Sequence, residues 1–272
     1  LIQGGGDPKL VVERLQELLR AIQDQGVRRI EGDILLDNSV FRLPPHNAAA
    51  FDDDPLRPYN VGPDGLLLNF KALVLRFIPE PAQRRVRIES QPPMAGVGVP
   101  AELPVTSGAC GDWRTRLALD FSDPEQLRLG GRYPLACGEQ EWAIAYPQPE
   151  RYAPRVIEAM WRAAGGALSG QVRWAEQRPV GARVLVTGLS LPLASVIADI
   201  NKYSNNVMAQ QLFLTLSAGD GRASFAESRN LLRRFWRDRF GLRTTPLVAH
   251  GSGLSLAEGA GAAALAALLQ QA

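Results

Sequence analysis

The chain has 272 residues, of which 46% are hydrophobic and 21% charged, and its formal net charge is +2. A chain of this length can bury a large core, and this composition excludes wholesale disorder. Only three of the 30 basic residues are lysines. Because the overall charge is nearly balanced, we interpret this skew as the mark of an arginine-rich genome and predict no nucleic-acid partner.

The chain carries no sign of a membrane anchor or a targeting signal. No apolar run approaches the roughly 20 residues that a transmembrane helix needs. The sequence begins Leu-Ile-Gln-Gly-Gly-Gly, without an initiator Met or the basic and apolar regions of a signal peptide. We therefore expect no transmembrane segment, and a start that is processed or excised.

Two stretches of the chain share one plan, a helix followed by glycine and a strand. In the first, Asp7-Pro8 predicts a helix start and Gly26 its end, and residues 30–37 are typical of a strand. In the second, residues 149–164 predict a helix, and residues 168–174 again follow glycine as a strand. We interpret the two units as a pseudo-repeat that pairs within one domain.

The segment between these units has a different texture. Residues 41–65 are rich in Pro, Asn, Asp and Gly and predict a long surface loop, and residues 66–78 predict a strand. From 81 to 146, short alternating segments separated by Pro and Gly favour a small all-β module. Residues 183–187 are a further strand candidate.

Two cysteines, Cys110 and Cys137, lie within the predicted β module. A spacing of this kind is compatible with one disulfide and equally with two free, buried thiols. The residues themselves leave both alternatives open.

After Gly188 the apolar residues recur at helical spacing. Four helices are predicted, over residues 192–203, 206–217, 224–240 and 260–271. The triplet Ser204-Asn205-Asn206 therefore falls in the turn between the first two helices. Short polar side chains at such a turn can cap the next helix and can also reach into a cleft.

Several common kinds of site are not supported. The two histidines, His46 and His250, have no Gly-x-Ser-x-Gly segment to serve in a serine triad. No His, Cys, Asp and Glu cluster has metal-ligand spacing. The run Gly4-Gly5-Gly6 lacks the lysine of a phosphate-binding loop and the full dinucleotide pattern. The sequence therefore predicts no metal and no cofactor.

The Ser204 triplet taken alone is most simply a helix cap, but its surroundings carry a second pattern. Asn-Lys-Tyr precedes it, Met-Ala-Gln-Gln-Leu follows it, and Gly-Ser-Gly-Leu-Ser occupies residues 251–255. Further short motifs, such as Gly-Asp-Ile at 32–34 and Leu-Asn-Phe at 68–70, keep the same order along nearly the whole chain. Together they resemble the D-alanyl-D-alanine carboxypeptidase/endopeptidase family, the class C low-molecular-mass penicillin-binding proteins.

The resemblance implies a multidomain α+β fold, in which a penicillin-binding domain is split by two inserted domains, one nested in the other. It implies insert domain II over residues 1–80 and 147–188, a nested β domain III over 81–146, and part of the penicillin-binding domain over 189–272. This division agrees with a pseudo-repeat on either side of a β module.

By the same resemblance, Ser204 relays a proton toward the leaving D-Ala nitrogen, and Lys202 lies close by. Asn206 hydrogen-bonds the substrate amide and orients the lysine partner of the nucleophile, and Ser252 belongs to the substrate-binding segment. A serine nucleophile that works without histidine needs such a lysine and a hydroxyl relay. The implied substrate is a peptidoglycan stem peptide ending in D-Ala-D-Ala, and the implied inhibitors are β-lactams.

The implied location is the periplasm or the extracytoplasmic cell envelope. Because proteins of this kind are exported, the resemblance favours a disulfide between Cys110 and Cys137.

The chain departs from the family pattern at its two other motifs. The residues three positions before the lysines are Gly6, Leu68 and Asp199, so Ser-x-x-Lys is absent, and so is Lys-Thr-Gly. In the family these motifs lie upstream and downstream of the part that the chain resembles. We therefore expect a chain that begins and ends inside its gene product and forms no acyl-enzyme by itself. His250 also stands where the family has Asp, which leaves its local hydrogen bonding open.

An alternative from another class is a non-catalytic binding or scaffolding module of the cell envelope. The full reading frame distinguishes the two hypotheses. Ser-x-x-Lys upstream and Lys-Thr-Gly downstream would support the peptidase, whereas their absence would support the module.

Overall fold

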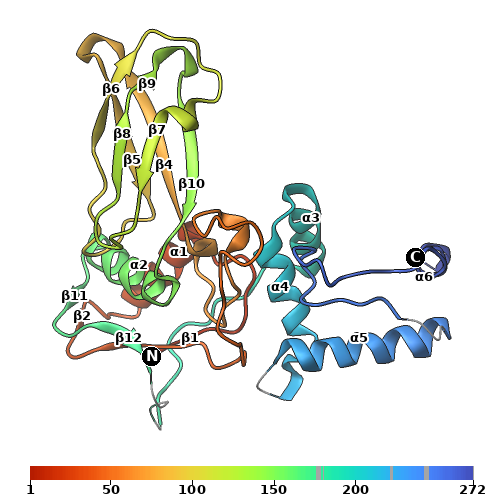
Figure 1. Cartoon of the computed structure of the whole chain (residues 1–272). Helices are drawn as coiled ribbons and strands as arrows, with labels where there is room; N and C mark the ends of the chain where they lie inside the picture. Colours follow the sequence, from red (N-terminus) through yellow and green to blue (C-terminus); the bar gives the residue numbers. More distant parts are fainter. Residues whose placement is uncertain (176–178, 180, 221–222, 242–244, 272) are drawn as a thin grey trace.

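The computed structural model describes residues 1–175, 179, 181–220, 223–241 and 245–271. The chain contains both helices and strands, and the strands form several separate sheets. This agrees with the expected multidomain α+β class. Figure 1 shows three parts: a tall module of β-strands, a base that contains α1 and α2, and a group of helices, α3 to α6, set to one side.

The base is built from the two predicted helix–glycine–strand units. The first unit contains α1 (Val12–Asp24), β2 (Arg29–Ile30) and β3 (Ile34–Asp37), and the second contains α2 (Pro149–Ala163), β11 (Ala167–Leu168) and β12 (Val172–Trp174). The strand β11 pairs in parallel with β2, and β12 pairs in parallel with β3. The short strand β1 (Ile2–Gln3) completes the three-stranded sheet on the other side of β3. Equivalent strands of the two units thus lie side by side.

Helix α1 begins later than Asp7-Pro8 predicted. The backbone of Leu10 forms a bridge with Leu68, so this stretch of chain is extended. The Asp7 carboxylate accepts a hydrogen bond from the amide of Lys9 at 2.9 Å and pairs with Arg14 at 2.7 Å. The helix therefore starts at Val12, after the stretch that these contacts hold extended.

The β module is a five-stranded sheet in the order β10-β4-β5-β6-β9, with a separate hairpin. Its strands are β4 (Ala72–Glu80), β5 (Arg85–Gln91), β6 (Glu102–Thr106), β9 (Tyr133–Pro134) and β10 (Gln140–Ala145), and the hairpin is β7 (Leu117–Asp120) with β8 (Arg128–Gly131). The strand β4, which precedes the expected boundary at residue 80, pairs with β5 and β10. The rings of Phe77, Trp113 and Tyr133 meet in the core of the module, with centroids 5.1 to 5.5 Å apart.

The helical part follows the predicted order. Its helices are α3 (Leu193–Tyr203), α4 (Asn206–Thr215), α5 (Phe225–Phe240) and α6 (Ala262–Gln271). The strand predicted for residues 183–187 is wrong: none of the described residues pairs with this segment as a strand, and Val184 is 76% exposed. Alternating apolar residues predict a strand only where a neighbouring strand and a core receive them.

Cys110, which follows β6, and Cys137, which follows β9, form a disulfide with their Cα atoms 4.7 Å apart. The bond closes a sequence separation of 27 residues. Restricting the unfolded chain by a loop of this length stabilises a fold by about 3–4 kcal/mol in the chain-entropy model.

We predict that replacing both cysteines by serine lowers the free energy of unfolding by about 3–4 kcal/mol. Urea unfolding monitored by tryptophan fluorescence measures this change. A reducing agent should destabilise the native chain and leave the double-serine variant unaffected. Two free thiols in the unfolded, unreduced native chain would contradict the pairing.

Candidate active site

In the turn Ser204-Asn205-Asn206, the middle residue, Asn205, caps the next helix. Ser204 ends α3 in the left-handed conformation, with φ 51° and ψ 44°. The Asn205 side chain accepts a hydrogen bond from the amide of Met208 at 3.0 Å and thereby caps α4. Among the described residues, none bonds the Ser204 hydroxyl, which is exposed. Ser204 and Asn206 are therefore not needed as caps.

Asn206 brings a distant segment to this turn. Its Nδ2 donates to the backbone oxygen of Ser252 at 2.9 Å, and no described residue donates to its Oδ1. The Ser252 hydroxyl lies 2.9 Å from Nδ1 of His250. The backbone amides of Ala249 and His250 donate to the Glu258 carboxylate at 2.7 and 3.2 Å. The histidine that replaces the expected Asp thus orients the Ser252 hydroxyl, and Glu258 holds the loop.

Lys202 lies next to the turn but contributes no side chain to the groove described below. Its side chain is exposed, and its Nζ lies 5.4 Å from the centre of the Tyr203 ring. Neither Lys202 nor Ser252 lines the cavity described next.

A groove of about 1050 Å³ runs from the Ser204 turn to the β module. The helical part contributes residues 203–207, and the base contributes the loop at 54–59 and the turn at Asn69-Phe70. The β module contributes Ala72, Val74, Asp112, Arg114, Thr115, Leu119, Trp142, Ala143 and Ile144. Ser204 and Asn206 thus line a groove whose walls come from three parts of the chain.

An unusual turn places Phe70 in the groove. Asn69, Phe70 and Lys71 all have positive φ, between 43° and 55°. A left-handed conformation costs roughly 1–2 kcal/mol for each residue that has a side chain. The turn is held by the Asn69 amide, which donates to the Leu10 oxygen at 2.9 Å, and by an ion pair of Lys71 with Asp64 at 2.9 Å. Strain at this point directs the aromatic ring into the groove wall.

The helix α4 is joined to the base through Gln211, whose residue is fully buried. Its side chain accepts from the amide of Asp64 and donates to the oxygen of Asp64, both at 2.9 Å. One turn earlier, Val207 packs with Val61, Leu67 and Ala145. The sequence did not predict Gln211 as a site residue, and its only signal is a glutamine on the apolar face of a helix.

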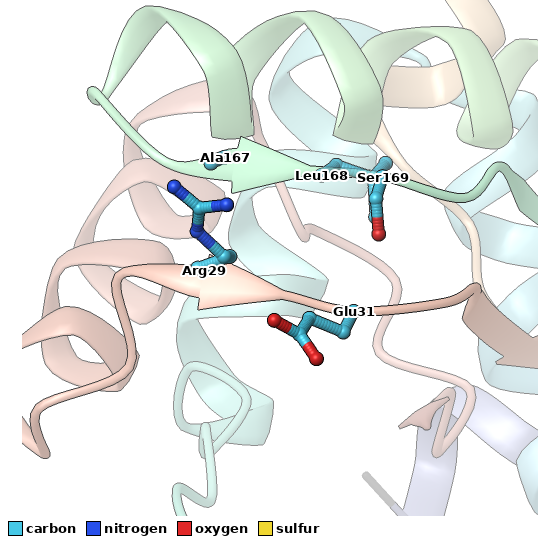
Figure 2. Close-up of a pocket in the computed structure, with 5 residues that line it drawn as sticks. All are labelled: Arg29, Glu31, Ala167, Leu168 and Ser169. Carbon is cyan, nitrogen blue, oxygen red and sulfur yellow. The ribbon is translucent and has the colours of Figure 1, made fainter.

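A second depression, of about 300 Å³, lies between β2 and β11 and is lined by Arg29, Glu31, Ala167, Leu168 and Ser169. Figure 2 shows the Arg29 side chain turned toward the β11 strand and the Glu31 carboxylate turned away from it. None of the predicted site residues lies here. Among the described residues, no three His, Cys, Asp or Glu side chains are placed to hold a metal ion.

Comparison with known proteins identifies the family. Residues 1–272 match the family described as D-Ala-D-Ala carboxypeptidase 3 (S13). The chain belongs to this family. A curated relative, D-alanyl-D-alanine carboxypeptidase DacB of Haemophilus influenzae, is 23% identical over 94% of the chain and 53% of its own length.

Solved structures support the fold. Penicillin binding protein 4 (dacB) from Haemophilus influenzae matches with a TM-score of 0.73 at 22% identity, over 97% of this chain and 59% of that chain. The same protein, complexed with a β-lactam, matches with a TM-score of 0.65 at 22% identity, over 98% and 57%. The chain therefore spans little more than half the length of the relatives that it matches. Within the part of the chain that the structure describes, no helix is long and apolar enough to cross a membrane.

We predict that Gln211→Leu lowers the free energy of unfolding by about 2–3 kcal/mol, because it leaves the buried N–H and C=O groups of Asp64 without partners. Chemical denaturation measures the change. Gln210→Leu is the matched control, since Gln210 is also buried but bonds no described residue through its side chain. A loss in the control as large as that in Gln211→Leu would contradict this role.

Proposed function

We propose that the chain is part of a serine-type D-Ala-D-Ala carboxypeptidase/endopeptidase of the periplasm or extracytoplasmic cell envelope. Its substrate is a peptidoglycan stem peptide ending in D-Ala-D-Ala, which it cleaves through an acyl-enzyme, and β-lactams acylate the same serine. The family match over residues 1–272 supports the reaction class. The observation that carries the proposal for this chain is that Ser204 and Asn206 both line the groove.

In the proposed mechanism, Ser204 and Asn206 assist a serine nucleophile and its lysine partner. Neither of these two groups is among residues 1–272. The Ser204 hydroxyl has no partner among the described residues and is exposed, so it is available to pass a proton to the leaving D-Ala nitrogen. Asn206 is fixed through its Nδ2, which leaves its Oδ1 available to accept a hydrogen bond from the substrate amide or the lysine ammonium.

The proposal also includes a division of the chain into domains. The sequence predicts insert domain II over residues 1–80 and 147–188, the nested β domain III over 81–146, and part of the penicillin-binding domain over 189–272. Because β4 (Ala72–Glu80) pairs with β5 and β10, the nested β domain begins at Ala72 in this proposal rather than at residue 81. In support, the two units of the base pair directly with each other, although the β module separates them in the sequence. The groove then lies where the insert domains meet the penicillin-binding domain.

We predict that the 272-residue chain alone forms no covalent adduct with a fluorescent penicillin, because it contains no Ser-x-x-Lys. Incubation followed by a denaturing gel tests this. A longer polypeptide from the same reading frame that adds this motif and Lys-Thr-Gly should label. A band on the 272-residue chain would contradict the assignment of the nucleophile, and a reading frame without these motifs would favour the non-catalytic module.

We predict that Ser204→Ala in the longer polypeptide lowers kcat/KM for a D-Ala-D-Ala peptide by about 10²–10⁴-fold, the usual contribution of a positioned proton-transfer group. Release of D-Ala measures the rate. Ser195→Ala is the matched control, because Ser195 is an exposed serine on the preceding helix and does not line the groove. Equal rates for Ser204→Ala and Ser195→Ala would remove Ser204 from the mechanism.

A further inference from the structure

Arg114 lies in the wall of the groove and is contributed by the β module. It belongs to the short 3-10 helix Trp113–Arg116. Its Cζ lies 5.2 Å from the centre of the Trp113 ring, and its Nη2 donates to the backbone oxygen of Glu141 at 3.2 Å. Trp113 is itself buried against Phe77 and Tyr133. The Arg114 side chain is therefore held in place against the core of the β module, while most of its guanidinium N–H groups donate to no described residue.

Arg114 differs from the other groove arginine in having no carboxylate partner among the described residues. Arg57 pairs with Asp54 at 2.7 Å. Within the β module, Arg76, Arg85, Arg87 and Arg128 form ion pairs with Glu or Asp. Arg84, Arg116 and Arg132 form none with the described residues, but they do not line the groove. No carboxylate of the described residues lies within ion-pair distance of Arg114. A guanidinium held in place with its fork unoccupied is suited to bind a carboxylate with two hydrogen bonds.

Arg114 and the Ser204 turn are separated, along β10, by about the length of a short peptide. On β10, Trp142 lines the groove near Arg114, and Ala145 packs against Val207 beside the Ser204 turn. Three residues of an antiparallel strand span roughly 10 Å, and side chains at each end extend this distance. An extended peptide spans about 3.3–3.6 Å for each residue. A peptide whose last two residues lie at Ser204 therefore reaches Arg114 with a residue several positions nearer its N-terminus.

We propose that Arg114 binds a free carboxylate of an acidic peptide, on the amino-terminal side of the D-Ala-D-Ala end that lies at Ser204 and Asn206. The inference rests on the proposed function, because that function fixes the direction of the peptide. The nested β module then selects substrates by charge, at a distance from the bond that is cleaved.

Asp112 supplies an internal test of this assignment. It also lines the groove, two residues before Arg114, and no ion pair links the two side chains in the structure. A carboxylate bound at Arg114 is repelled by Asp112, so removing the Asp112 charge should strengthen binding of an acidic peptide. If Arg114 served only the stability of the fold, removing the Asp112 charge would not strengthen the binding that removing Arg114 weakens.

The test is binding of a fluorescein-labelled pentapeptide to the 272-residue chain, measured by fluorescence anisotropy. One probe carries glutamate at the second position and ends in D-Ala-D-Ala, and the other carries glutamine at that position. Arg114→Gln should weaken binding of the glutamate probe about tenfold, as expected for hydrogen bonds to a charged group. Asp112→Asn should tighten it, by about two- to threefold, as expected for one exposed charge. Neither variant should change binding of the glutamine probe.

Arg116→Gln is the matched control, because Arg116 is exposed on the same 3-10 helix and does not line the groove. Equal binding in Arg114→Gln and Arg116→Gln, equal losses for both probes, or no binding of either probe by the native chain would overturn the inference. Penicillin labelling of the longer polypeptide tests the proposed function separately. If the longer polypeptide is labelled by penicillin but the chain binds the glutamate and glutamine probes alike, only the role of Arg114 is contradicted. If the chain prefers the glutamate probe but the longer polypeptide is not labelled, the proposed peptidase function is contradicted.

Discussion

The groove depends on one buried polar cluster, in which Asp64 meets Gln211, Lys71 and Asn38. The cluster joins helix α4, which follows the Ser204 turn, to the segment that turns Phe70 into the groove. Buried charges are tolerated only when their hydrogen-bonding groups are satisfied. Asp64 meets this condition, since its carboxylate also accepts from the amide of Leu66 at 3.0 Å. The relative position of Ser204 and Phe70 therefore follows from a network that loses stability if any member is removed.

The sequence predicted the local parts of this arrangement well. Helical periodicity and short polar residues placed the Ser204 turn between α3 and α4, and the glycine-punctuated pattern revealed two units that pair in the structure. Both signals arise within one or two turns of chain. The start of α1 and the strand at residues 183–187 were predicted wrongly, because distant partners decide them. Leu10 is held extended by Leu68, and no strand in the part of the chain that the structure describes pairs with residues 183–187.

The groove could not be predicted, since its walls come from residues up to about 150 positions apart. Arg114 and Gln211 show why. Nothing in their neighbours distinguishes Arg114 from an ordinary surface arginine, or Gln211 from Gln210 beside it. Only the folded chain shows that one arginine is held over Trp113 with no carboxylate partner in the described part of the chain, and that one glutamine bridges two segments. The motif identifies the family, and tertiary packing determines which side chains face a ligand.

Native-state hydrogen exchange on the 272-residue chain tests most directly whether the helical part and the base form one unit. The amide of Asp64 donates to Gln211, and the amides of α4 lie in the helix that carries Gln211. Amides that are exposed by one cooperative opening share one free energy of exchange. The account predicts a common value for Asp64, Leu66 and the central residues of α4. Exchange of α4 at a much lower free energy than Asp64 and Leu66 would contradict it.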